Sequence, residues 1–321
     1  MKRIFIAGAA LLALASTAMA QEKATLRLNW LIYGFHTPFF LGIERGFYKA
    51  EGIELEIGEG KGSASAVQVI GAKGDTFGLA DGASIINGVT KGAPVKAVMG
   101  IMNTTPFAVI MREDANVKSI KDLEGKTIAA TAGEAGLTIM PALFKANKLD
   151  ESKINFLRVD GATKLVAALE GRSQGLLGGS ENQPFLLEQK GLKTTVLNYA
   201  DYGVNTMGLA ILVNQDTLKD KSKLVEGFIR ATQKAFAAAE ADPAASVAAG
   251  LKANPNMDKD LALKQLHAGL KLTRSRNAPS APFGEMQESD WSMTIQLMKD
   301  YQELKTDLPA SGFYTNQYLP K

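Results

Sequence analysis

Segments with the periodicity of strands alternate with segments that have the periodicity of helices, and this alternation limits the fold more than any other feature of the chain. Residues 25–30 and 53–57 carry apolar side chains at every second position, which is typical of strands. The residues between them, 37–52, have the apolar spacing of a helix. Similar units follow as far as residue 212, and strands that alternate with helices in this way form a mostly parallel sheet covered on both faces. We therefore predict an α/β fold.

The length and the rhythm of the chain predict two domains. Its 321 residues exceed the size at which one hydrophobic core stops growing. A second α/β rhythm starts near Ser119, and after residue 213 the chain is mainly helical. We predict a first domain of residues 21–111 and 203–321, with residues 112–202 inserted as the second. Two crossing strands, near residues 109–112 and 207–212, are the predicted hinge, and a ligand cleft is expected between the domains.

The first twenty residues have the layout of a secretory signal peptide. Lys2 and Arg3 precede an apolar run over residues 4–15, and small residues stand at Ala18 and Ala20. The run is shorter than the roughly 20 residues that a membrane-spanning helix needs. An amphipathic or buried N-terminal helix is the alternative, but no polar face interrupts the run. We predict cleavage after Ala20 and a periplasmic location.

Composition argues against several classes of function. Without Lys2 and Arg3 the 36 basic side chains fall to 34, against 33 acidic ones, so charge gives no support to nucleic-acid binding. The chain has no cysteine, which excludes disulfides, thiolate metal sites and a cysteine nucleophile. It also lacks the G-x-S-x-G and H-E-x-x-H motifs. We expect a binding protein that is not an enzyme and that uses no cofactor or metal.

The aromatic stretch LNWLIYGFHTPFF, residues 28–40, is the first candidate site, because aromatic residues make up only 7% of the chain. It lies where a predicted strand turns into a helix, which is where α/β sheets present ligand-binding groups. The faces of Trp30 and Tyr33, with His36 as a donor, suit a flat heteroaromatic compound or a cation. The alternative is that Trp30 and Phe39 belong to the core and that backbone groups satisfy His36.

Polar residues at other strand ends are further candidates. Residues 60–65, GKGSAS, have the form of an anion-binding loop, although an ordinary helix start capped by Ser63 or Ser65 explains them at least as well. Asp81 follows a strand, where helix capping is favoured over ligand binding. Glu181 and Asn182 combine a carboxylate with an amide, which can bind an exocyclic amino group and a ring nitrogen, or cap the next helix.

A glycine turn in the second unit, TAGEAG, contains Gly133 and follows a strand in the same way as residues 60–65. The two turns are expected to face each other across the cleft.

These stretches carry a family likeness. The first aromatic stretch with its continuation to EGIELEI, then GDTFGLADGASI, SIKDLEGKTIA, DYG at residues 201–203 and GEMQESDW near the end resemble the periplasmic substrate-binding proteins of ABC transporters. The resemblance covers almost all of the chain after the predicted leader. It is to the branch that binds nitrate, sulfonates, taurine and pyrimidine precursors of thiamine. It implies the two-domain type II fold, a small-molecule ligand, a membrane permease with its ATPase as partner, and a monomer.

Within that branch the pyrimidine-precursor binders look nearest. Their likeness implies that Trp30, Tyr33 and His36 contact the ligand from the first domain, and Glu181 from the second. The eukaryotic relatives that make the pyrimidine depend on a cysteine-rich iron motif, which this chain lacks. The full set of predicted ligand contacts is Trp30, Tyr33, His36, Ser63, Asp81, Phe107, Gly133, Glu181, Asn182 and Tyr202.

The predicted ligand is a neutral or weakly basic heteroaromatic compound, because the candidate stretches are aromatic and acidic and contain no arginine. A sulfonate, nitrate or other small organic anion is the alternative, and it requires a more basic pocket. A second alternative is a ligand-loaded sensor that docks to a membrane receptor. For a heteroaromatic ligand and for an anion alike, ligand contacts to both domains favour closure of the hinge.

Overall fold

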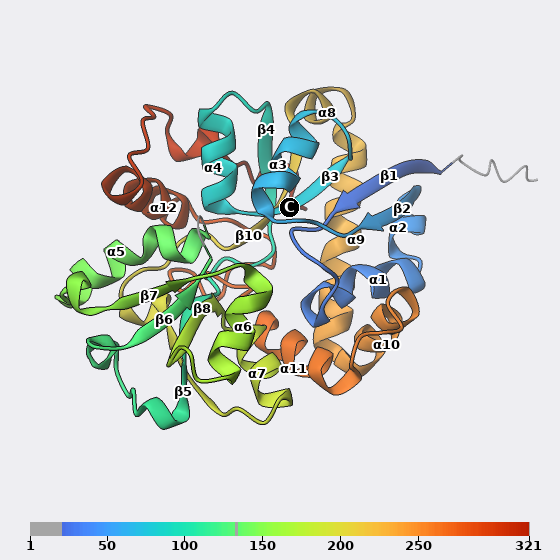
Figure 1. Cartoon of the computed structure of the whole chain (residues 1–321). Coiled ribbons are helices and arrows are strands. Elements are labelled where there is room, and N and C mark those ends of the chain that lie inside the picture. The colour runs from blue at the N-terminus through green and yellow to red at the C-terminus, as the bar shows by residue number, and fades with distance from the viewer. Residues whose placement is uncertain (1–20, 132–133, 321) are drawn as a thin grey trace, which may run out of the picture.

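Two five-stranded sheets, each covered by helices on its faces, form the two lobes of the molecule (Figure 1). The structure is a computed structural model, and it describes residues 21–131 and 134–320. The predicted signal peptide and Gly133 lie outside the described residues. The predicted α/β fold is confirmed. The strands are β1 (Glu22–Arg27), β2 (Ile53–Gly58), β3 (Phe77–Asp81), β4 (Val95–Gly100), β5 (Phe107–Arg112), β6 (Thr127–Ala130), β7 (Asn155–Arg158), β8 (Gly175–Gly179), β9 (Thr194–Asn198) and β10 (Leu209–Asn214).

The first lobe is built on a sheet with the strand order β2-β1-β3-β10-β4. β1 runs parallel to β2 and β3, whereas β10 is antiparallel to both of its neighbours. Every residue of β10 is buried, as expected for a strand with helices on both faces. Its helices are α1 (Thr37–Glu44), α2 (Phe47–Ala50), α3 (Ser63–Gly71), α4 (Gly82–Thr90), α8 (Gln215–Asp220), α9 (Ser222–Ala241), α10 (Pro243–Ala253), α11 (Lys259–Leu270) and α12 (Glu288–Tyr301).

The second lobe repeats this arrangement with the order β7-β6-β8-β5-β9, where β5 is the antiparallel strand. Its helices are α5 (Ala135–Asn147), α6 (Gly161–Leu169) and α7 (Gln183–Gln189). We predicted that the first domain extends to residue 111 and that residues 109–112 form a hinge. The pairing of β5 with β8 and β9 corrects both expectations, because it assigns this strand to the second sheet.

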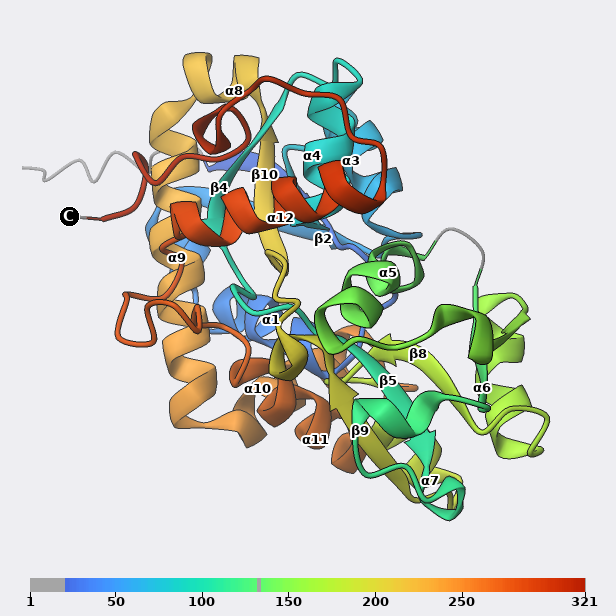
Figure 2. The same ribbon diagram turned by 90° about the vertical axis from the view of Figure 1, so that its left-hand side faces the viewer.

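The chain crosses between the lobes at residues 101–106 and 199–208, which lie between β4 and β5 and between β9 and β10. The Thr105 N–H donates to Asn205 Oδ1 at 3.0 Å, so the two crossings are joined to each other. The Met207 N–H donates to Thr294 Oγ1 of α12 at 2.7 Å. α12 lies beside α4 of the first lobe and α5 of the second (Figures 1 and 2). Trp291 is buried there and stacks on Tyr314 with a centroid separation of 5.3 Å.

The helix predicted over residues 37–52 is divided into α1 and α2 by Gly46, whose φ of 70° leaves the helical region. Gly52 has a φ of 74°, the left-handed conformation that glycine favours after a helix. Thr37 is the first residue of α1, and its hydroxyl donates to the Gly34 carbonyl.

Candidate functional site

A cavity of about 520 Å³ lies between the lobes, at the edge where the strands of both sheets end. Asn29 and Trp30 follow β1, Asp81 ends β3, Thr131 follows β6 and Glu181 follows β8. The antiparallel strand β5 brings its first residue to the same edge, because that residue pairs with the last residue of β8. Ligands of open α/β sheets bind at such edges. Of the predicted contacts, the residues that line this cavity are Trp30, Tyr33, Ser63, Asp81, Phe107, Glu181 and Asn182.

The aromatic stretch divides between the cavity and the core. Trp30 lines the cavity and remains 47% exposed, while Tyr33 lines it and is buried. Phe35 and Phe39 are fully buried in the first lobe, and both make edge contacts with Phe236. The core alternative therefore holds for Phe39 and fails for Trp30.

A hydrogen bond between the lobes spans the cavity. Tyr33 Oη donates to Glu181 Oε1 at 3.3 Å, and both side chains are buried. Burial raises the pKa of Glu181 to about 7, and burial next to this carboxyl raises the pKa of Tyr33 well above its usual range. The second carboxyl oxygen, Glu181 Oε2, has no hydrogen-bond partner in the described part of the chain. The cavity thus contains a carboxyl group whose pKa is raised by burial and one of whose oxygens has no partner among the described residues.

His36 is placed behind the wall of the cavity and does not line it, contrary to our prediction. It is fully buried, and its Nε2 bonds to Asn29 Oδ1 at 3.0 Å, while its ring meets the edge of Tyr33 at 4.4 Å. Burial lowers the pKa of His36 to about 3, so the imidazole is neutral at physiological pH. Because Asn29 and Tyr33 both line the cavity, His36 positions two residues of its wall.

Tyr202 also lies away from the cavity. It belongs to a short 3₁₀ turn after β9, and its carbonyl accepts a hydrogen bond from Asn147 Nδ2 at 3.0 Å. Tyr202 is not among the described residues that line this cavity, and its partly buried side chain packs against the hydrophobic core.

Asp81 caps α4, as the favoured alternative predicts. Its carboxylate accepts from the Ser84 N–H at 2.9 Å and from Ser84 Oγ at 2.7 Å. Its own N–H donates to Ser63 Oγ at 3.1 Å. Ser63 is the first residue of α3 and does not cap it, since Gly62 occupies the cap position. Both side chains line the cavity while holding two helix starts together.

Asn182 stands at the start of α7 without capping it. Its Oδ1 accepts from Gln265 Nε2 of α11 at 2.8 Å, and Gln265 Oε1 accepts from the Gly34 N–H at 3.0 Å. Gln265 is buried and forms a second polar link between the lobes. Sequence reasoning missed it because its partners are far away along the chain.

An ion pair in the second-lobe wall, between the buried Lys164 and the partly exposed Glu134, was also missed. Lys164 Nζ lies 2.5 Å from Glu134 Oε2, and Glu134 Oε1 accepts from the Thr131 N–H at 3.1 Å. All three residues line the cavity, together with Lys61 from the first lobe. The start of α5 directly after β6 was the available signal for Glu134. No arginine is among the described lining residues, as predicted for the cleft.

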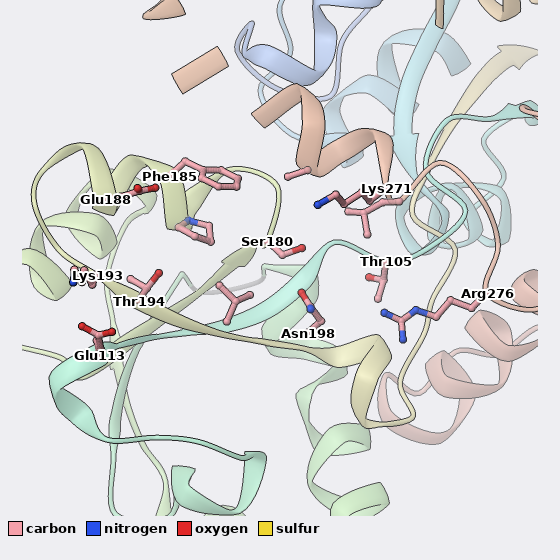
Figure 3. Close-up of a pocket in the computed structure, with 14 residues that line it drawn as sticks. Thr105, Glu113, Ser180, Phe185, Glu188, Lys193, Thr194, Asn198, Lys271 and Arg276 are labelled. Atoms are coloured by element: carbon pink, nitrogen blue, oxygen red, sulfur yellow. The ribbon is translucent and has the colours of Figure 1, made fainter. Parts of the chain in front are cut away.

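A second hollow, of about 710 Å³, lies between the end of α11 and the face of β9 and α7 (Figure 3). We call it the back groove. Lys271 and Arg276 stand at one end of it, and Phe185 and Glu188 at the other (Figure 3). Arg276 pairs with Asp201 at 2.7 Å. In the described part of the chain, no polar atom of its lining is both buried and unpartnered.

Residues 21–131 and 134–320 contain neither a metal-binding cluster of side chains nor a membrane-spanning helix. Acidic and histidine side chains gather nowhere in these ranges in a group of three that could hold a metal ion. No helix there is long and apolar enough to cross a membrane.

Comparison with known proteins identifies the family. The pattern of the family described as NMT1/THI5 like matches residues 34–246. The chain belongs to this family. It is 24% identical to riboflavin-binding protein RibY of Chloroflexus aurantiacus, over 93% of this chain and 86% of that protein. It is 25% identical to 4-amino-5-hydroxymethyl-2-methylpyrimidine phosphate synthase of Legionella pneumophila, over 94% and 93%.

The formylaminopyrimidine-binding protein of Halalkalibacterium halodurans is 21% identical, with 94% of this chain and 92% of that protein covered. Among solved structures, the alkanesulfonate-binding protein SsuA of Xanthomonas axonopodis superimposes with a TM-score of 0.70 at 14% identity. The match covers 92% of this chain and 99% of that one. The predicted two-domain periplasmic-binding-protein fold is thereby confirmed.

Proposed function

We propose that this protein is the periplasmic solute-binding component of an ABC importer and that it captures a small, pyrimidine-like heteroaromatic compound. The observation that carries the proposal is the Tyr33–Glu181 hydrogen bond, which joins the lobes inside the cavity and leaves Glu181 Oε2 without a partner. A buried carboxyl oxygen without a partner costs free energy, which a ligand donor group recovers.

The chemistry of the lining favours a flat ring with hydrogen-bonding nitrogens. Glu181, whose pKa is about 7, accepts from an exocyclic amino group when ionised and donates to a ring nitrogen when protonated. Trp30 offers an aromatic face that is still partly open. The ammonium group of Lys164 is already compensated by Glu134, and Lys61 shares the lining with the carboxyl groups of Asp81 and Glu181. The cavity therefore has no excess of positive charge and suits an uncharged ring better than nitrate or a sulfonate.

Hinge closure supplies the mechanism. The ligand contacts Trp30 in the first lobe and Glu181 in the second only when the lobes are closed, so binding stabilises that state. Two direct hydrogen bonds between the lobes, Tyr33 to Glu181 and Gln265 to Asn182, also stabilise the closed state. A permease then distinguishes the closed, loaded protein from the open, empty one.

The names of the relatives support a ring of this class, because two of them are called riboflavin-binding and formylaminopyrimidine-binding proteins. Another is called a pyrimidine phosphate synthase. Binding is the better proposal for this chain, which has no cysteine for the iron motif that the resemblance associates with that synthesis.

The test begins with native mass spectrometry of the protein purified from periplasm, followed by release and identification of the bound compound. A stoichiometric aromatic heterocycle is the expected result. Calorimetric titration then compares 4-amino-5-hydroxymethyl-2-methylpyrimidine, riboflavin, methanesulfonate and nitrate on the wild type and on Glu181→Ala, with Glu188→Ala in the back groove as the matched control. An empty protein that binds only the anions would refute the proposal. Stimulation of a receptor and not of the permease ATPase would favour the sensor alternative.

A further inference from the structure

One polar group of the cavity wall has no part in the proposed recognition of the ring. It consists of Thr131, Glu134 and Lys164, which we call the second-lobe triad. Glu134 accepts from the Thr131 N–H through Oε1 and from Lys164 Nζ through Oε2, so its carboxylate holds the other two residues in place. The triad lines the same cavity as Glu181 but comes from different elements, the ends of β6 and the starts of α5 and α6.

The positive charge of Lys164 and the negative charge of Glu134 compensate each other within the triad. Lys164 is 6% exposed, and such an ammonium group is tolerated in a protein interior when a carboxylate compensates it. Glu134 supplies that carboxylate at 2.5 Å. The triad therefore offers hydrogen-bond donors without net positive charge. A phosphate or sulfonate placed here would be attracted by the Lys164 ammonium but repelled by the Glu134 carboxylate. The cost of removing the anion from water is therefore not offset.

The hydroxyl of the triad is available. Thr131 Oγ1 is buried, has no hydrogen-bond partner in the described part of the chain, and belongs to a residue that lines the cavity. A hydroxyl both donates and accepts one or more hydrogen bonds, and the Lys164 ammonium carries three N–H donors, of which Glu134 takes one. Each of these groups can therefore form a hydrogen bond with an oxygen atom of a ligand in the cavity.

We propose that the second-lobe triad is a subsite for an uncharged oxygen substituent of the ligand, a hydroxyl or carbonyl group carried on the ring, and that it selects against the phosphorylated or sulfonated form. The inference rests on the proposed function for the ring itself. It defines the substrate as a heteroaromatic compound with one neutral oxygen-bearing arm.

The first test uses three probes that differ only in this arm: 4-amino-5-hydroxymethyl-2-methylpyrimidine, its 5-methyl analogue and its phosphate ester. The wild type is expected to bind the hydroxymethyl compound about tenfold more tightly than either of the others, as the loss of one buried hydrogen bond implies. Thr131→Val should remove the preference for hydroxymethyl over methyl, and Thr131→Ser should keep it. Equal binding of hydroxymethyl and methyl compounds would overturn the subsite while leaving the proposed function intact.

The second test does not depend on the ring. Glu134→Gln leaves Lys164 uncompensated, so this variant should gain at least tenfold in affinity for methanesulfonate, and for the phosphate ester, over the wild type. Glu134→Gln combined with Lys164→Met removes both charges and should lose this gain. Thermal unfolding of each variant checks that it is folded. If none of the pyrimidines binds, the proposed function fails, and methanesulfonate still decides the subsite. A folded Glu134→Gln protein without any gain in anion affinity would contradict the proposal.

Discussion

The cavity and the back groove are both hollows between the lobes, but they differ in the burial and pairing of their polar side chains. In the cavity and its wall, Glu181 and His36 are buried, and atoms such as Thr131 Oγ1 have no hydrogen-bond partner among the described residues. Around the back groove, Lys264 pairs with Glu188 at 2.9 Å and Arg276 with Asp201 at 2.7 Å, and all four side chains are largely exposed. Size does not separate the two regions, since the back groove is the larger. The two regions differ instead in their buried polar groups: among the described residues, the lining of the cavity includes the unpartnered atoms Thr131 Oγ1 and Glu181 Oε2, and the lining of the back groove includes none.

This difference predicts that pH acts on the cavity side and hardly on the back groove. The largest effect is expected for His36→Gln. Burial holds the pKa of His36 at about 3, against 6.5 in the unfolded chain. Below pH 6.5 the unfolded chain therefore takes up a proton that the folded protein does not, and stability falls by about 3 kcal/mol by pH 4. Urea unfolding from pH 4 to 8 should lack this loss in the variant, and parallel curves for the two proteins would contradict the burial argument.

Glu181→Gln also tests the cavity side, but here the stability of the wild type is expected to fall as pH rises. Burial raises the pKa of Glu181 from 4.5 to about 7, so between these values the folded protein keeps a proton that the unfolded chain has released. Stability then falls as pH rises through this range, by a total of about 3 kcal/mol, and is not recovered above pH 7. The variant should gain stability relative to wild type between pH 4.5 and 8.

Glu188→Gln in the back groove is the matched control for that experiment, because Glu188 is exposed and paired. Its free energy of unfolding should differ from that of the wild type by less than about 1 kcal/mol at pH 4.5 and at pH 8, because exposed ion pairs contribute little to stability. A pH-dependent gain in this control would mean that the two regions do not differ in the way described.

Replacing one aromatic residue in the cavity and one in the back groove distinguishes residues that contact the ligand from residues that lie only between the lobes. Trp30→Ala should weaken binding of the heteroaromatic ligand by about 10- to 100-fold, since stacking of a base on an aromatic side chain contributes about 1–3 kcal/mol. Phe185→Ala in the back groove should change affinity less than about twofold. Calorimetric titration of both variants measures this contrast, and equal losses would show that closure, not contact, limits affinity.

The smallest effects are expected from the ion pairs of the back groove. Removing Lys264 or Arg276 by substitution with Ala should lower stability by less than about 1 kcal/mol, because exposed pairs are screened by solvent and salt. Thermal unfolding at low and high salt provides the measurement. If either substitution weakened ligand binding more than about tenfold, the back groove would be part of the closing mechanism. The two regions would then not differ in function as described.

Strand ends account for most of what was predictable. Trp30, Asp81 and Glu181 follow strands whose alternating or apolar pattern is clear in the sequence, and parallel strands bring their carboxyl ends to one edge. The capping role of Asp81 was predictable for the same reason, since its partner Ser84 is three residues away.

The remaining features depend on partners distant in the sequence. Lys164 looks like a solvated residue of an amphipathic helix until Glu134 is brought beside it, and Gln265 gains its role only when α11 reaches Asn182. His36 has the polarity of a loop residue, and only the packing around it makes it a buried neutral imidazole. β5 was assigned to the wrong sheet because its apolar pattern suits either one.

The position of β10 also sets the order in which the molecule can be assembled. β10 lies between β3 and β4, and Asp81 pairs with Leu209, so the first sheet stays divided into two pieces until the chain has returned from the second lobe. All five strands of the second lobe, β5 to β9, precede β10 in the chain. The second lobe can therefore complete its sheet first, and closure of the first sheet is a late, long-range step of folding.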